Sequence, residues 1–266
     1  MKRAYTQIPE GQMHYRWAGS GPDAFIFLHM SGSSSDEFEA VGDQLAARGC
    51  RAYAVDLLGF GSSDAPPRYY SLADHGETII SFLDSLGLDR VYLYGNLAAA
   101  NLCVHIAVDH PDRVCGMVLA HPLHSPNPEQ YAQKRFLPEY SVIQPKADGS
   151  HMLELWRRSY KYGEAPEVCE ARCRCLHTAG DWGETLHWAL FEDTPVSQLF
   201  PRISVPTVVV GYESFGDPAQ LEQLTPLIPR GTFEFCPGGT PYVSRARPGQ
   251  VTELILKHFP LPLEPV

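Results

Sequence analysis

Short apolar runs alternate with amphipathic helical tracts along most of this chain, and this alternation restricts the possible folds more than any other feature. The strand-sized runs are DAFIFLHM (23–30), RAYAVDLLG (51–59), RVYLYGN (90–96), VCGMVLAHP (114–122), PTVVVGYE (206–213) and TFEFCPGG (232–239). Helical periodicity occupies residues 71–86, 98–110 and 251–259. Apolar strands separated by helices predict an α/β fold with a mostly parallel sheet that helices cover on both faces.

Two parts of the chain depart from this pattern. The segments RAYTQIP and QMHYRWAG near the N-terminus alternate polar and apolar residues, which predicts an antiparallel hairpin at the edge of the sheet. Residues 124–201 contain helical segments such as HMLELWRRSY and GETLHWALFED, with no convincing buried strand. Because the strand pattern resumes directly afterwards, we predict a core of residues 1–123 and 202–266 with an inserted helical cap, 124–201.

Composition excludes several classes of protein. The 266 residues are 44% hydrophobic and 20% charged, which is typical of a globular chain. A net charge of −10 and the lack of any basic run make nucleic acid and anionic membranes poor partners. The N-terminus lacks the apolar core of a secretory signal, no apolar stretch approaches the roughly 20 residues that span a bilayer, and the seven cysteines show no disulfide-framework spacing. We therefore expect a cytoplasmic protein whose partner is a small-molecule substrate or ligand; the oligomeric state stays open.

One cysteine-rich stretch resembles a metal site only superficially. Cys169, Cys173 and His177 would share a helix face, but the first and last lie about 12 Å apart along the axis. A single zinc ion takes ligands at about 2 Å, so it cannot hold all three. There is also no G-x-G-x-x-G after the first strand and no P-loop. We predict neither metal nor cofactor.

Five segments in order along the chain resemble the α/β-hydrolase superfamily. YLYGNLAAANLCVHIAVDHPDRVCGMVLAHP is similar to its nucleophile-elbow unit, and FLHMSGSSSDEF is similar to its oxyanion loop. DLLGFGSSDAP resembles its D-x-x-G-x-G-x-S loop, VPTVVVGYES the strand before its acid, and CPGGTPYVSRARPGQVTELILKHF the segment that normally holds its histidine. The resemblance implies the α/β-hydrolase fold.

The same resemblance implies that the catalytic triad is replaced. Leu97 stands at the nucleophile position of the elbow, and Ser214 at the position of the acid. Counting back from Pro248 places Pro241 at the histidine position, and there is no histidine between His187 and His258. Acyl-enzyme chemistry needs a nucleophile, a base and an orienting acid, so ordinary serine-hydrolase activity is disfavoured.

Other parts of the site are expected to remain. By resemblance, the backbone amides of Met30 and Ala98 form an oxyanion hole, at the start of the helix that follows the elbow. His121 and His124 end a strand and are candidates for proton transfer, although each is alternatively a strand-end histidine bonded to backbone. Asn96 either donates a hydrogen bond into the pocket or ties the elbow to a neighbouring strand.

The remaining candidates line the expected pocket. They are His29, Leu97, Trp156, His187, Trp188 and Pro241. For His29 the alternative is a residue that fixes the oxyanion loop, and for the cap residues it is core packing. Asp56 is interpreted as a loop-fixing residue.

Three functions fit these residues. The first is a non-hydrolytic enzyme of lyase, cyclase, isomerase or decarboxylase type, which uses the oxyanion hole and a histidine acid/base on a small, mostly apolar carbonyl substrate. The second is a catalytically inactive pseudoenzyme that binds a ligand. The third is a hydrolase in which groups outside the triad positions activate water.

Overall fold

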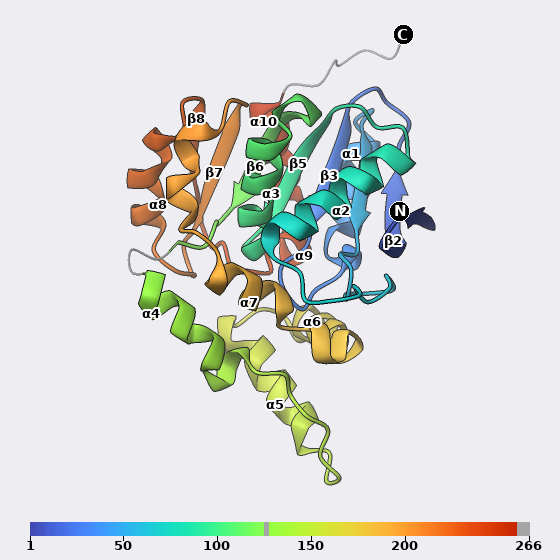
Figure 1. Ribbon diagram of the computed structural model, residues 1–266, viewed down its shortest axis with the longest axis vertical. Coiled ribbons are helices and arrows are strands. Elements are labelled where there is room, and N and C mark those ends of the chain that lie inside the picture. The colour runs from blue at the N-terminus through green and yellow to red at the C-terminus, as the bar shows by residue number, and fades with distance from the viewer. Residues whose placement is uncertain (125–127, 260–266) are drawn as a thin grey trace.

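An eight-stranded sheet forms the centre of the molecule (Figure 1), in the order β1-β2-β4-β3-β5-β6-β7-β8. The computed structural model describes residues 1–124 and 128–259. The strands are β1 (Lys2–Ile8), β2 (Gly11–Ala18), β3 (Ala24–Leu28), β4 (Arg51–Val55), β5 (Val91–Asn96), β6 (Val114–Ala120), β7 (Thr207–Tyr212) and β8 (Gly231–Cys236).

The strand pairing follows the sequence pattern. β1 pairs with β2 in an antiparallel hairpin at the sheet edge, and β2 is antiparallel to β4. All the other pairs, from β4–β3 to β7–β8, are parallel. The prediction of a mostly parallel α/β sheet with an N-terminal edge hairpin is therefore confirmed.

Helices cover both faces of the sheet, as Figure 1 shows. The helices around the sheet are α1 (Glu39–Ala46), α2 (Leu72–Ser85), α3 (Ala98–Asp109), α8 (Pro218–Leu224), α9 (Val243–Ala246) and α10 (Pro248–His258). Strand β3 shows why two layers are needed: Ile26 and Leu28 pack in one buried cluster with α2, α3 and α8, whereas Phe25 and Phe27 pack in another with α1, α9 and α10. Burial on both faces explains the continuous apolar runs of the sequence. The sequence did not reveal α1, α8 or α9.

The described part of the segment predicted to be a cap contains helices and no strand. It contains α4 (Pro128–Gln133), α5 (Ser150–Ser159), α6 (Pro166–Ala179) and α7 (Thr185–Glu192), joined by turns. These helices lie together beyond one end of the strands (Figure 1). Residues 125–127 and 260–266 of the predicted domains lie outside the described part, and the boundaries at 124 and 201 stay predictions. Among the described helices, none has the length and apolar character required to cross a membrane.

Candidate functional site

A cavity of about 370 Å³ lies between the sheet and the cap. Residues that follow β3, β5 and β6 and the loop after β8 line it from the core, namely Met30, Leu97, His121 and Pro241. Arg158, Arg172, Glu184 and His187 line it from the cap. The cavity therefore lies outside the carboxyl ends of the parallel strands, where ligands bind in open α/β sheets.

The turn between β5 and α3 has the geometry expected of a nucleophile elbow. Leu97 has φ 53° and ψ −115°, and its amide donates to the carbonyl of Ala120 at 2.9 Å. A Cβ atom on Gly95 would lie 2.2 Å from the carbonyl oxygen of Ala99, so the turn closes only because this residue is glycine. A leucine at positive φ costs about 1–3 kcal/mol. The strained turn is thus present, and it presents an isobutyl side chain to the cavity.

Asn96, beside this turn, is fully buried and does not line the cavity. Its Nδ2 donates to Oε1 of Glu37 at 2.6 Å and to the carbonyl of Pro241 at 2.9 Å, and its Oδ1 accepts from the hydroxyl of Tyr212 at 2.9 Å. Of the two sequence interpretations, these bonds favour the one in which the amide ties the elbow to its neighbours. Burial raises the pKa of Glu37, a carboxyl group under the elbow that sequence reasoning missed.

The oxyanion hole expected at the amides of Met30 and Ala98 stays a prediction. Met30 lines the cavity after β3, and Ala98 is the first residue of α3, so its N–H has no acceptor within the helix. His29 does not line the cavity, contrary to the pocket prediction. Its Nδ1 bonds to the carbonyl of Met30 at 2.9 Å, and its Nε2 accepts from the amide of Leu57 at 3.2 Å. Burial lowers the pKa of His29, so a neutral ring holds the loop.

His121 lines the cavity directly after β6 and has a positive φ of 52°. Its Nδ1 accepts from the amide of Tyr212 at 2.9 Å, and burial lowers the pKa of His121 to about 4. In a neutral ring that accepts at Nδ1, the proton must sit on Nε2. The ring can therefore donate a hydrogen bond from Nε2. Its lone pair on Nδ1 is already engaged by the amide of Tyr212, so no free lone pair is left to act as a base.

This depressed pKa makes the stability of the protein depend on pH. Between pH 6.5 and about 4 the unfolded chain protonates His121 and the folded chain does not, so acidification favours unfolding. At pH 5 this protonation lowers the free energy of unfolding by about 2 kcal/mol. Urea unfolding at pH 7.5 and 5 should show the wild type losing about 2 kcal/mol more than His121→Gln. An equal loss in both proteins, with His177→Gln as the exposed control, would refute the assignment.

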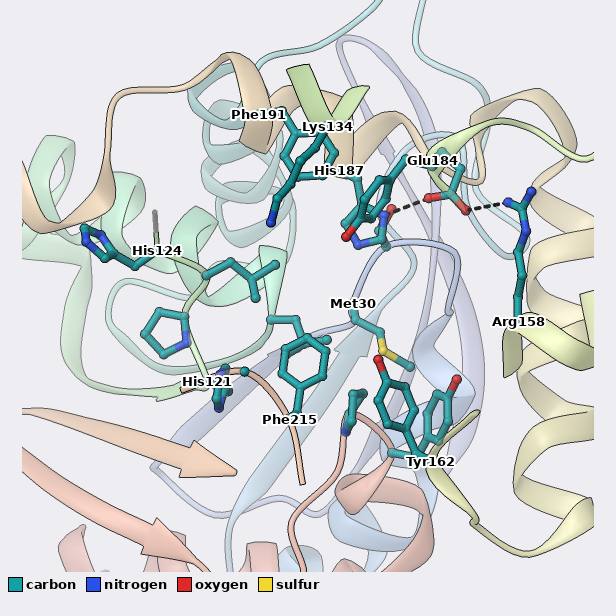
Figure 2. A pocket seen from close by; sticks show the side chains of 18 of the residues that line it. Met30, His121, His124, Lys134, Arg158, Tyr162, Glu184, His187, Phe191 and Phe215 are labelled. Carbon is teal, nitrogen blue, oxygen red and sulfur yellow. Dashed lines mark hydrogen bonds and ion pairs between the residues drawn. The ribbon is translucent and has the colours of Figure 1, made fainter. Parts of the chain in front are cut away.

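His124 also lines the cavity, at its margin in Figure 2. Burial lowers the pKa of His124, and its buried Nδ1 has no hydrogen-bond partner within residues 1–124 and 128–259. Its catalytic role stays a prediction.

His187 forms an acid–base pair with Glu184 at the cavity. Its Nδ1 lies 2.7 Å from Oε2 of Glu184, as the dashed line in Figure 2 shows, and a second dashed line joins Glu184 to Arg158 at 4.0 Å. Glu184 is buried at the N-cap of α7, where the helix dipole favours negative charge. With Nδ1–H donated to the carboxylate, Nε2 of His187 can accept a proton. The sequence placed His187 in the pocket but gave it no carboxylate partner.

The two tryptophans predicted to line the pocket do not reach it. Trp156 stacks on Tyr160 with 5.5 Å between ring centroids, and Nε1 of Trp188 donates to the carbonyl of Tyr140 at 2.9 Å. Both rings instead pack within the cap, which was the alternative interpretation.

The cavity also receives positive charge that the sequence did not reveal. Nη1 of Arg172 is buried and has no hydrogen-bond partner in the described part of the chain. A Cβ atom on Gly32 would lie 2.9 Å from this nitrogen, so the guanidinium lies against the loop that follows β3. Lys134 lines the same cavity and points toward its interior (Figure 2). The described residues contain no cluster of three or more His, Cys, Asp or Glu able to hold a metal ion.

The sheet order, the strained turn after β5 and the cavity at the carboxyl ends of the strands define the α/β-hydrolase fold. Residues 23–143 match the family model for this fold. Two solved structures superpose on almost the whole chain. The thermophilic esterase of Thermogutta terrifontis has a TM-score of 0.82 at 19% identity and covers 97% of each chain. The enol-lactonase of Burkholderia xenovorans has a TM-score of 0.79 at 17% identity and covers 96% of this chain and 99% of its own.

Curated relatives match a shorter part of the chain. The 2-hydroxy-6-oxononadienedioate/2-hydroxy-6-oxononatrienedioate hydrolase of Paraburkholderia phymatum is 32% identical over 123 residues, 43% of each chain. Epoxide hydrolase 2 of Siraitia grosvenorii is 38% identical over 109 residues, 40% of this chain and 34% of its own. The aligned part spans less than half of either relative's length. Over this part, the chain is similar to these two hydrolases.

Proposed function

We propose that this protein is a cofactor-independent enzyme that moves a proton on a small carbonyl substrate without forming an acyl-enzyme. The proposal takes Leu97, Ser214 and Pro241 as the triad positions, so nucleophile, acid and base are missing from their usual places. The observation that carries it is the His187–Glu184 pair, whose 2.7 Å contact leaves Nε2 of His187 to exchange a proton at the cavity.

The reacting oxygen would lie at the amides of Met30 and Ala98. Negative charge that develops on a carbonyl oxygen is stabilised there by two N–H groups and by the positive end of α3. Because Leu97 cannot attack the carbonyl carbon, the accessible reaction is removal of a proton from the neighbouring carbon by His187. The products are an enolate and a protonated histidine, as in an isomerase, lyase or cyclase. In a decarboxylase the enolate would form instead as CO2 leaves, and a protonated His187 would then donate its proton to the enolate carbon. His187 therefore replaces His121, the candidate from the sequence, as the proposed base.

The proposed substrate carries a carboxylate. Arg172 lines the cavity and lies beside the loop that supplies the Met30 amide, and guanidinium groups bind carboxylates through paired hydrogen bonds. Lys134 adds a second positive charge at the cavity. The relative from Paraburkholderia phymatum is named for dioate substrates, which agrees with this choice. The substrate is therefore more polar than the mostly apolar one expected from the sequence.

Hydrolysis by directly activated water is the second candidate. The curated relatives named above are both hydrolases, which favours it. In this reaction His187 takes a proton from water as the water oxygen attacks the carbonyl carbon, and the amides of Met30 and Ala98 hold the resulting oxyanion. When the oxyanion collapses, the bond to the leaving group breaks, and the leaving group takes the proton back from His187. No bond to the protein forms in either candidate reaction.

The proposed setting is the cytoplasm. The seven cysteines are all free thiols, six of them buried, which fits a reducing compartment. The proposed partner is a small anionic molecule, and the chain's net charge of −10 still argues against nucleic acid and anionic membranes.

Deuterium exchange tests the proposal before the true substrate is known. The wild-type protein is incubated in D₂O with a panel of 2-oxo mono- and dicarboxylates, and NMR follows deuterium entering the carbon beside the carbonyl. We expect catalysed exchange for at least one dicarboxylate. In parallel, aryl esters and lactones are offered with and without a serine-directed phosphonate. Hydrolysis that resists the phosphonate would favour the water mechanism. Binding of these compounds without exchange or hydrolysis would overturn the enzyme proposal in favour of a ligand-binding protein.

A further inference from the structure

A second hollow of about 240 Å³ lies on the other side of the loop that follows β3. The β1–β2 hairpin and helix α6 line it, together with Ser34, Ser35 and Asp36 of that loop. None of its lining residues also lines the main cavity. It is therefore a separate site, to which the proposed reaction assigns no role.

Two arginines face each other across the hairpin. Arg3 and Arg16 are paired residues in the β1–β2 register, and both line the hollow. Directly opposed side chains in an antiparallel pair have Cβ atoms about 5 Å apart, and like charges placed in this way destabilise the sheet. The next pair along the same face, Tyr5 and His14, packs ring edge to ring face with centroids 5.0 Å apart. The register thus places the two arginines side by side on the face of the hairpin that lines the hollow.

A third arginine reaches the same hollow from the cap. Arg174 of α6 lines it, and no ion pair joins Arg3 or Arg174 to any carboxylate among residues 1–124 and 128–259. Arg16 is only 9% exposed, and its buried Nε has no hydrogen-bond partner within that part of the chain. Its one ion pair is a 3.4 Å contact with Glu39, which the N-terminal amine also approaches at 3.9 Å.

The two carboxylates that line the hollow already have partners. Asp36 accepts from Arg245 at 2.7 Å and from the hydroxyl of Ser34 at 2.8 Å. Asp56 contacts Nδ1 of His14 at 2.8 Å and accepts from the amides of Ser35 at 2.5 Å and Ser62 at 2.8 Å. Neither carboxylate forms an ion pair with Arg3, Arg16 or Arg174 in the described part of the chain.

We propose that this hollow binds a small tetrahedral oxyanion, a phosphate group free or on a small molecule, between Arg3, Arg16 and Arg174. Guanidinium groups match the oxygens of phosphate with paired, charge-assisted hydrogen bonds. The anion removes the repulsion between the two hairpin arginines and joins the hairpin to the cap. A cavity of about 240 Å³ accommodates a phosphate with a small attached group.

Titration with inorganic phosphate tests this site. Binding is measured by calorimetry and by thermal unfolding at constant ionic strength, with sodium chloride replacing phosphate in the reference, on the full chain. We expect saturable binding in the wild type, and binding at least about tenfold weaker in Arg3→Gln and in Arg174→Gln. Without phosphate, Arg3→Gln should be at least as stable as the wild type, because the substitution removes a like-charge pair. Arg230→Gln, an exposed arginine elsewhere on the surface, is the matched control.

Three outcomes would overturn the site. The first is phosphate binding that does not saturate in the wild type. The second is an equal response in the wild type, Arg3→Gln and Arg174→Gln. The third is a sodium chloride reference that reproduces the effect of phosphate. Saturation by succinate but not by phosphate would overturn the choice of a tetrahedral anion. None of these results depends on whether the main cavity supports catalysis, so failure here is distinguishable from failure of the proposed function.

Discussion

Replacing His187 with glutamine should lower the catalysed rate of proton exchange by about 10²- to 10⁴-fold, the usual contribution of a general base. The glutamine amide can still donate a hydrogen bond to Glu184, so the polar contact at 2.7 Å has a substitute. It cannot accept a proton near neutral pH, so the chemical step is lost while the fold is kept. The rate is measured by deuterium incorporation, and folding by the urea-unfolding midpoint.

A matched histidine separates chemistry from general effects of substitution. His105 contacts Asp193 at 2.7 Å, the same distance as in the His187 pair, and neither residue lines the cavity. His105→Gln should therefore leave exchange unchanged. Glu184→Gln removes the carboxylate that orients His187 and should also lower the rate. Full activity in a folded His187→Gln protein would refute the role of this base.

Restoring three side chains together should convert the protein into an esterase. The combined variant Leu97→Ser, Ser214→Asp and Pro241→His should hydrolyse p-nitrophenyl acetate about 10²- to 10⁴-fold faster than the wild type, because triad residues act as a unit. The scaffold for this gain is present. The turn at Leu97 keeps φ at 53°, the carbonyl of Pro241 is bonded to Asn96 at 2.9 Å, and the amide of Ser214 donates to Gly239 at 2.9 Å.

Variants that carry only part of the triad are the controls, because the three residues must act together. Leu97→Ser alone, and Leu97→Ser with Ser214→Asp, should stay near the wild-type rate because neither places an imidazole at position 241 to activate the new hydroxyl. A serine-directed phosphonate should label position 97 in the triple variant only. Labelling of the wild-type protein would contradict the assignment of the triad positions. A folded but inactive triple variant would show that position 241 does not bring an imidazole within reach of position 97.

Local patterns predicted the fold well because burial leaves a periodic signal. The runs at residues 24–28 and 207–212 are buried along their whole length, and β3 and β7 form there. The alternating N-terminal segments form the β1–β2 hairpin at the sheet edge. Helix α8 was missed because it is seven residues long and begins with Pro218 after a capping Asp217, too short for a clear period.

Predictions for single site residues were less complete, because each role depends on contacts between distant segments. The tautomer of His121 is set by the amide of Tyr212, 91 positions away. His29 was placed in the pocket, but bonds to Met30 and Leu57 hold it behind the loop. Trp156 and Trp188 pack inside the cap instead of lining the cavity. Arg172 carried no sequence signal at all, since a helical arginine is usually a solvated surface residue.

The amino-acid sequence by itself determined the α/β architecture, the tight turn at Gly95 and the presence of a leucine at that turn. Apolar periodicity and the steric freedom of glycine are local properties, so they can be read from neighbouring residues. Only the tertiary structure decided which groups meet at the cavity and which arginines meet across the hairpin. Hydrogen bonding and Coulomb interactions act over a few ångströms in space, and only folding brings residues from distant parts of the chain within that range.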